Sequence, residues 1–463
     1  MTDLTQTVTN QPGFELHPLR ASLYDELHSR PFQQIQAPAR VTHLAVLCPE
    51  SERARQFRHL QALCELFGAP VPAQDSSCFQ QDFGDLRVRR ETHMEFVAYT
   101  FIHLGAVDAA IPAADAPFAL TALALLPPGW LDQLHGAVVG AFHVAFEYSE
   151  LEGKQLLPQA KRNFEGMRLI GSSPQQGDAH IWTSFRLHSD GFGRFLVYNR
   201  GMSPSQLGRL MQRLLEIETY RLLMLLGMPL ARSIAPELSV MDAGLADITR
   251  RLAGNADLDE AVILAELTAM AARVEDFRAQ STFRFSATRA YHELVLKRLD
   301  ELNEDEVSGH LTLTEFITRR VTPAVRTCET VGRRLEDLSR RIDRVSDMMR
   351  TRVELSIQGQ NRALLASMDR RSRIQLMMQH TVEGLSVAAI SYYSVGLLKH
   401  IITAVYDAGV PLNKDLAVGV SVPLVLGTVW FVTRRIHKHF HELAREERSA
   451  EARRGSAKQA EKK

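Results

Sequence analysis

The sequence predicts an α+β cytosolic domain followed by a mostly α-helical region with a long stalk helix and a C-terminal two-helix transmembrane hairpin. Three observations lead to this prediction. Strand and helix patterns alternate between residues 40 and 230. Apolar residues recur at 3,4 spacing within 322–380, which is typical of a long packed helix. Residues 416–433 carry no charge, which is typical of a membrane-spanning helix.

The chain is long enough for several folded units. We expect five regions: an N-terminal extension (1–39), an α+β cytosolic domain (40–230), a helical domain with the stalk (235–381), a transmembrane hairpin (382–433) and a basic cytosolic tail (434–463). Basic and acidic residues number 54 each, so no overall charge favours nucleic acid, and no nucleic-acid partner is expected. The cysteines lack CxxC spacing, which argues against a zinc ribbon, and the N-terminus lacks a signal-peptide pattern.

The α+β domain is expected to combine several short strands with two helices. The strand patterns cover residues 41–48, 86–101, 138–147, 180–188 and 192–199, and the helical patterns cover 53–67 and 206–226. Ser203 and Gln206 have the spacing of a capping box, with Pro204 at the first helical position.

Polar residues alternate with apolar ones in these strands. Along 86–101 the alternation places Met94 and Phe96 on one face of the strand and the polar residues between them on the other. It therefore predicts that Met94 lies in the core. If the strands are neighbours, one face gathers a candidate ligand or metal site: Glu91, His93, Glu95, His143 and His188. Imidazole and carboxylate groups suit a divalent metal or proton transfer. The alternative is a solvated polar face, which antiparallel sheets often carry.

The stalk is predicted from an apolar stripe at helical spacing, comprising Val331, Leu335, Leu338, Ile342, Val345 and Met349. Thr322 can cap a helix that starts at Pro323, and a helix from there through the first span would reach roughly 80 residues, or about 120 Å. Upstream, helices are expected over 258–280 and 286–307, and Thr312 with Glu315 predicts a capping box that opens a short helix.

The hairpin consists of a weaker span over 382–402, interrupted by Lys399, and a stronger span over 416–433. Between them, Gly409 and Asn413 supply turn chemistry. Arginines flank the outer ends of both spans, so the positive-inside rule predicts two spans with both termini in the cytosol, in a bacterial inner membrane. The alternative is an apolar helix pair inside a soluble protein.

Five stretches carry a resemblance to a known family: ELHSRPF (26–32), RRETHMEFVAYTF (89–101), IWTSFRLHSDGFGRFLV (181–197), YRLLMLLGMPLA (220–231) and HTVEGLSVAAISYY (380–393). They resemble a proteobacterial family of predicted membrane-anchored proteins that is known as a domain of unknown function. The resemblance covers almost the whole chain. It implies a membrane location and carries over no catalytic residue.

The order of domains is also similar to that of CorA-type divalent cation channels. In those channels a Gly-Met-Asn motif ends the first span, whereas the matching stretch here reads YDAGVPLN, over 406–413. The likeness implies a central path formed by several protomers. Its candidate pore and loop residues are Ser391, Tyr392, Ser394, Gly409 and Asn413.

Three functions follow from these observations. The first is an oligomeric inner-membrane scaffold or regulatory module with a large cytosolic domain, whose partners are the lipid bilayer and further copies of the chain. The second is a CorA-like cation transporter. The third is a membrane-tethered, metal-dependent enzyme that uses Glu91, His93, Glu95 and His188. No P-loop, GxGxxG, GxSxG or HExxH motif supports an enzyme of a familiar class.

Overall fold

The computed structural model describes residues 17–20, 23–24, 33–74, 76–103, 116–254, 259–409, 411 and 413–435. It divides into two compact units, Met1–Asp347 (unit 1) and Met348–Lys463 (unit 2), and each is described by itself. Most of the expected N-terminal extension, and the expected basic tail beyond Arg435, lie outside the described residues. The boundaries expected near 230 and 381 fall inside helices.

Within the described residues, unit 1 is built on a nine-stranded mixed sheet in the order β2-β3-β4-β1-β5-β8-β7-β6-β9. Strands β5 and β8 pair in parallel, and the other neighbours pair antiparallel. The strands are β1 (Ala39–Leu47), β2 (Cys78–Phe83), β3 (Leu86–Thr92), β4 (Phe96–His103), β5 (Ala137–Tyr148), β6 (Ile170–Pro174), β7 (Ala179–Thr183), β8 (Gly193–Asn199) and β9 (Glu304–Glu306).

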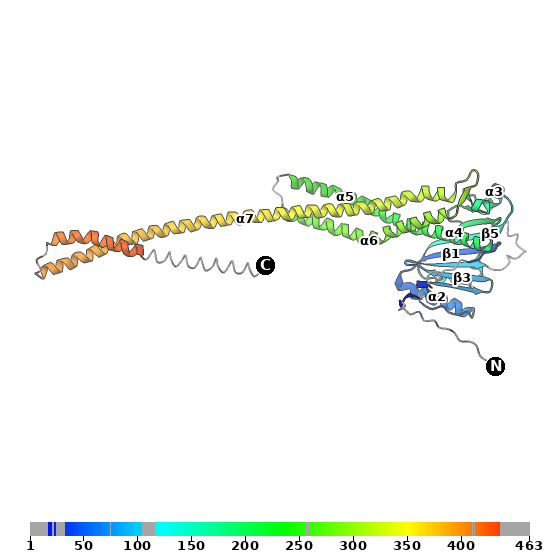
Figure 1. Ribbon diagram of the computed structural model, residues 1–463, viewed down its shortest axis with the longest axis horizontal. Helices are drawn as coiled ribbons and strands as arrows, with labels where there is room; N and C mark the ends of the chain where they lie inside the picture. Colours follow the sequence, from blue (N-terminus) through cyan, green and yellow to red (C-terminus); the bar gives the residue numbers. More distant parts are fainter. Residues whose placement is uncertain are drawn as a thin grey trace, which may run out of the picture. The chain divides into compact units, whose positions relative to one another are not determined.

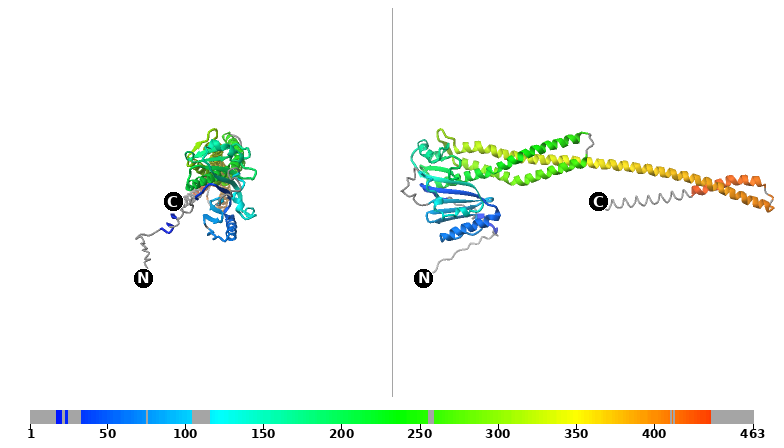
Figure 2. Two further views of the ribbon diagram at one scale, coloured as in Figure 1. Left: turned by 90° about the vertical axis from the view of Figure 1, so that its right-hand side faces the viewer. Right: turned by 180° about the vertical axis from the view of Figure 1, so that it is seen from behind.

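Helices cover both faces of this sheet (Figures 1 and 2). On one face lie α4 (Pro204–Leu225), α6 (Glu260–Asp300) and the first turns of α7 (Leu313–Asp407). Leu214 and Ile317 from these helices share a buried cluster with Val144 of the sheet. On the other face, α2 (Arg53–Leu66) packs over β1, β3 and β4, and α3 (Gly153–Arg162) packs over β7 and β8.

A three-helix layer extends from this core. It consists of α5 (Gly227–Ala253), α6 and the part of α7 that belongs to unit 1 (Figure 1). In unit 1 the predicted apolar stripe of the stalk is buried from Val331 to Val345. Asp242 of α5 pairs with two arginines of α7, at 3.1 Å from Arg334 and 2.7 Å from Arg341. Within unit 1 the stripe therefore belongs to an intramolecular helix layer.

Several elements differ from the sequence-based expectations. The strand expected over 86–101 is two strands, β3 and β4, because residues 93–95 form a tight turn in which the His93 N–H donates to the Phe96 carbonyl over 2.9 Å. Met94, expected in the core, is 81% exposed at that turn. The strand expected over 180–188 ends at Thr183. These errors arise because a continuous alternation of residues does not reveal a change of chain direction.

The helical region is more continuous than expected. The two helices expected over 258–280 and 286–307 form the single helix α6, in which the Ser281 hydroxyl donates to the Phe277 carbonyl over 2.7 Å and so does not interrupt the helix. The predicted start at Pro323 is wrong, because α7 begins at Leu313 and passes through Pro323. The Thr312–Glu315 capping box is confirmed, with the Glu315 N–H donating to the Thr312 hydroxyl over 3.1 Å.

In unit 2, the end of α7 and a C-terminal helix, Lys414–Arg435, form an antiparallel hairpin, coloured orange in Figure 1 and seen from behind in Figure 2. Gly409 follows the end of α7 with a φ of 91°, a conformation that favours glycine. By length and composition alone, the described helices Pro204–Ala253, Leu313–Val405 and Lys414–Arg435 could cross a membrane. Many side chains of the first contribute to the core of unit 1.

Candidate functional site

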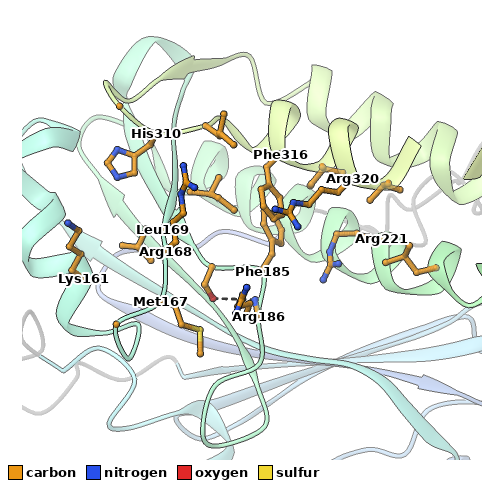
Figure 3. A pocket seen from close by; sticks show the side chains of 18 residues that line it. Lys161, Met167, Arg168, Leu169, Phe185, Arg186, Arg221, His310, Phe316 and Arg320 are labelled. Carbon is orange, nitrogen blue, oxygen red and sulfur yellow. Dashed lines mark hydrogen bonds between the residues drawn. The ribbon is translucent and has the colours of Figure 1, made fainter. Parts of the chain in front are cut away.

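A cavity of about 690 Å³ lies in unit 1 where the ends of β6 and β7 meet α4 and the start of α7 (Figure 3). Its polar residues and glycines are Lys161, Gly166, Arg168, Ser184, Arg186, Arg221, Gly309, His310 and Arg320. Its apolar residues are Met167, Leu169, Ile170, Phe185, Leu225, Leu311, Phe316, Ile317 and Val321. We call it the cationic pocket.

Five basic side chains and no acidic one belong to this lining. Lys161, Arg168, Arg186 and Arg320 are exposed and make no ion pair with any described residue. Arg221 is the exception, because its guanidinium donates two 2.7 Å hydrogen bonds to Glu218. Burial disfavours the charged form of Arg221, but the Glu218 carboxylate more than compensates and raises its pKa. The pocket therefore carries a concentrated positive potential that attracts an anion.

The floor of the cationic pocket is apolar and aromatic. The rings of Phe185 and Phe316 stack with centroids 5.2 Å apart and an angle of 6° between their planes. The guanidinium of Arg320 lies 4.8 Å from the centre of the Phe316 ring, and that of Arg221 lies 5.3 Å from the Phe185 ring. Figure 3 shows the two rings together, with Arg186, Arg221 and Arg320 around them. A ligand with an apolar body and an anionic group fits both features.

The wall of the pocket after β7 is held in an unusual backbone conformation. Phe185 has a φ of 49°, a left-handed conformation that costs energy for a side chain of this size. Two hydroxyls fix the turn: the Phe185 N–H donates to the Thr183 hydroxyl and the Arg186 N–H to the Ser184 hydroxyl, each over 3.2 Å. Such strain is common where a loop positions functional groups.

Ser184 also links the pocket wall to a buried histidine. Its hydroxyl oxygen lies 3.3 Å from Nε2 of His188, and Nδ1 of His188 lies 3.6 Å from a carboxylate oxygen of Glu165. The His188 side chain has no exposed surface, and burial, aided by the charge of Arg194, lowers its pKa despite the opposing effect of Glu165. A neutral imidazole therefore lies between a hydroxyl and a carboxylate.

The five residues expected on one face of the sheet do not lie together. Glu91 pairs across β3 and β4 with Ala98, which packs against α4, so Glu91 belongs to the α4 face. His143 follows Phe142, which also faces the α4 side, so the alternation of the strand places His143 on the opposite face with His188. The turn at residues 93–95 and the strand order cause this separation.

On the α4 face the structure does bring Glu91 and His93 together. Both line a smaller cavity of about 250 Å³ with His43 and Arg298. Glu91 is engaged by Arg89 at 2.9 Å, and the ring of His93 stacks on Phe96 with centroids 4.2 Å apart.

Glu95 lies nearby in the sequence but is held by Arg284 of α6 at 2.6 Å. On the opposite face, Nδ1 of His143 lies 2.8 Å from the Thr42 hydroxyl, and the imidazole is buried. Across the parts of the chain that the structure describes, no three histidine, cysteine, aspartate or glutamate side chains form a group that could hold a metal ion.

The expected pore residues occupy different positions in the hairpin of unit 2. Ser391 is buried, whereas Tyr392 is 77% exposed. Ser394 is half-buried, Gly409 ends α7, and Asn413 precedes the C-terminal helix, where its carbonyl accepts from the Ala417 N–H over 3.0 Å. Their expected role in conduction stays a prediction.

The cationic pocket could not be found from residue spacing, because its basic residues come from α3, the loops beside β6 and β7, α4 and α7. One signal was present in the sequence. Ser184, Phe185, Arg186 and His188 all fall within the stretch IWTSFRLHSDGFGRFLV, one of the five that carried the family resemblance.

The comparisons with known proteins agree with that resemblance. The family model described as "Protein of unknown function (DUF3422)" matches residues 15–440. The chain belongs to this family. No curated protein and no solved structure matches it. Both units of this DUF3422 protein fall largely within the matched residues. Its proteobacterial origin and its likeness to CorA-type channels stay predictions.

Proposed function

We propose that this DUF3422 protein is a membrane-anchored regulatory module, held in the bilayer by the hairpin of unit 2, whose unit 1 binds an organic anion in the cationic pocket. The observation that carries the anchoring is the apolar exposure of the hairpin. Leu397, Leu424 and Phe431 are each more than 60% exposed, and residues 416–433 of the C-terminal helix carry no charge. A soluble protein rarely leaves so continuous an apolar surface in water.

The orientation and assembly belong to the same proposal: two spans in a bacterial inner membrane, both termini cytosolic, and several copies of the chain together. Arginines at 370, 371 and 373 and at 434 and 435 flank the hairpin, which supports a cytosolic side for both ends. Gly419 and Gly427 have no described atom within 4 Å of the position where a Cβ would lie, and this supports close approach of a helix from another copy.

The membrane anchor is tested by the double variant Val420→Arg/Leu424→Arg. Each arginine near the centre of a span costs about 2.5–3.5 kcal/mol of insertion free energy. We expect the unaltered chain to stay in the membrane fraction through a sodium carbonate wash and the variant to leave it. Leu66→Arg/Val240→Arg, at positions each 66% exposed in unit 1, is the matched control and should stay with the membrane. Release of the unaltered chain by carbonate would refute the anchor.

Ligand binding is tested by calorimetry on the full chain in lipid nanodiscs with 1-naphthyl phosphate, which joins an aromatic body to an anion. Naphthol, which has only the aromatic body, and inorganic phosphate, which has only the anionic group, should each bind more weakly. Arg320→Glu should weaken binding at least ~10-fold, since a charge-assisted hydrogen bond contributes about 1.5–3 kcal/mol. Arg319→Glu, the neighbouring exposed position outside the pocket lining, should change it less than ~3-fold. Equal effects would refute the assignment of the pocket.

A further inference from the structure

Ser184 lines the cationic pocket, and its hydroxyl contacts the Arg186 backbone and the His188 ring. The hydroxyl oxygen accepts the N–H of Arg186 over 3.2 Å and lies 3.3 Å from Nε2 of His188, within reach of a proton transfer between the two. In the tautomer that carries the imidazole proton on Nδ1, the Ser184 hydroxyl donates to Nε2. Nδ1 lies 3.6 Å from a Glu165 oxygen, an electrostatic contact that is longer than a hydrogen bond. The order hydroxyl, imidazole, carboxylate is that of a nucleophile, a base and the acid that orients the base.

The surroundings of His188 keep it neutral. Its side chain is buried, and the charged groups that act on it are Arg194, Glu165 and Asp190. Burial and Arg194 lower the pKa of the imidazole, while the two carboxylates raise it, and the net pKa lies below the usual histidine value. At neutral pH the imidazole is therefore free of a second proton and able to accept one.

Contacts with Ser189 and Arg194 hold the Glu165 carboxylate, and its Oε2 atom faces His188. The backbone N–H and the hydroxyl of Ser189 both donate to it, the latter over 2.7 Å, and Arg194 lies 3.5 Å from it. Its φ is 51°, so Glu165, like Phe185 beside the serine, occupies a left-handed conformation. The two contacts of His188 therefore come from loops that each contain a left-handed residue, Glu165 itself in one and Phe185, which follows Ser184, in the other.

We propose that Ser184 and His188 cleave a carboxylic ester bound in the cationic pocket, with Glu165 as the positioning residue for His188. This inference rests on the proposed function, because it uses the same pocket. The ester would carry an apolar body for the Phe185 and Phe316 rings and a separate carboxylate or phosphate for the rim arginines. Of these three residues, only His188 belongs to the candidate ligand or metal site that the sequence predicted.

The chemistry is that of acyl transfer to serine and then to water. The Ser184 oxygen forms a bond to the acyl carbon as its proton passes to Nε2 of His188, and the ester C–O bond breaks as that proton moves to the departing alcohol. Water then attacks the acyl-serine, giving its proton to His188, and the carboxylic acid leaves while the proton returns to Ser184. Water is the only co-reactant, and no group is oxidised or reduced.

Two probes on the full chain in nanodiscs test this reaction. The first is a fluorophosphonate, which labels an activated serine covalently and is located by peptide mass spectrometry. The second is the anionic ester mono-4-nitrophenyl glutarate, compared with neutral 4-nitrophenyl butyrate. We expect labelling at Ser184 and preferential hydrolysis of the anionic ester, with both lost in Ser184→Ala and His188→Asn.

Ser173→Ala is the matched control, because the Ser173 hydroxyl also contacts a histidine, 2.7 Å from Nδ1 of His180, but lies outside the pocket lining. It should keep the wild-type rate. Glu165 is exposed, so Glu165→Gln should reduce kcat by a smaller factor, about 10-fold. It should also move the acid limb of the pH–rate profile to lower pH, since the carboxylate raises the pKa of His188.

The outcomes separate the two proposals. If 1-naphthyl phosphate binds and depends on Arg320 while neither probe reacts at Ser184, the pocket is a binding site only and the catalytic inference is wrong. If Ser184 is labelled and the anionic ester is cleaved without naphthyl phosphate binding, the anion-binding proposal is wrong and catalysis stands. Retained naphthyl phosphate binding by Ser184→Ala shows that the variant is folded, so its loss of turnover counts in favour of catalysis.

Discussion

Two buried histidines, one on each face of the sheet in unit 1, each contact a threonine hydroxyl. Nδ1 of His43 lies 2.9 Å from the Thr100 hydroxyl on the α4 face, and His143 makes the corresponding contact with Thr42 on the other. Burial is the main cause that lowers the pKa of each imidazole, from 6.5 to about 4. Both are therefore neutral polar residues in the core at physiological pH.

The pKa of His143 predicts acid sensitivity. Between pH 6.5 and about 4 the unfolded chain protonates this histidine and the folded chain does not, so stability is full above pH 6.5 and falls as the pH drops through this window. The full loss is about 3 kcal/mol at 1.36 kcal/mol per pKa unit. His143→Gln should flatten the pH dependence of the unfolding midpoint measured by near-UV circular dichroism. His135→Gln, at an exposed position, should leave it unchanged; an equal flattening would contradict this prediction.

The residue types were visible in the sequence, but their grouping was not. The alternation correctly separated His143 from Phe142 and Val144, which lie in the core on the α4 side. It failed at Glu91, His93 and Glu95, because the tight turn between β3 and β4 interrupts the period of two that was used to assign them to one face.

At the scale of elements, the layer of α5, α6 and α7 is stabilised mainly by its apolar contacts. Leu238 of α5 is fully buried, whereas Asp242 on the same helix is one-third exposed in its pairs with Arg334 and Arg341. Burying apolar area removes it from water and stabilises the layer, whereas solvent screens an ion pair that is about one-third exposed.

This difference predicts unequal effects of two substitutions one helical turn apart. Leu238→Ala should lower the free energy of unfolding of unit 1 by about 2–5 kcal/mol, through lost contacts and a cavity. Asp242→Asn should lower it by less than about 1 kcal/mol. Chemical denaturation of the full chain, followed by far-UV circular dichroism, measures both. A larger loss for Asp242→Asn would indicate that the ion pairs dominate the layer.

Helices were easier to predict than strands for a physical reason. The Ser203 and Thr312 capping boxes are local hydrogen-bond patterns, and both form as expected. Proline and serine are weaker signals, because α7 continues through Pro323 and α6 through Ser281 when neighbouring apolar positions are packed. The three-residue strand β9 has no alternation of apolar and polar residues that would predict it, and it forms by pairing with β6.

At the scale of the whole molecule, the proposed topology predicts which side of the membrane each part of unit 2 faces. The loop that contains Gly409 should lie outside the cytosol, and Arg435 inside. In intact cells an impermeant maleimide should label Asp415→Cys and not Arg435→Cys, and lysis should expose the second. Both variants are made in a Cys78→Ser background, because Cys78 is half-buried, whereas Cys48, Cys64 and Cys328 are buried and should contribute little background. The reverse labelling pattern would refute the orientation.

The sequence by itself determined the periodic features of this DUF3422 protein: the long helices, their caps, the apolar hairpin at the C-terminus and most strands of the sheet. Each depends on neighbours within a few residues, so composition and spacing are sufficient to indicate it. Only the tertiary structure decided the strand order, the faces of the sheet and the cationic pocket. Arg168, Arg221 and Arg320 are far apart in the sequence and meet because packing of α4 and α7 against the sheet brings them together, and no local pattern encodes that meeting.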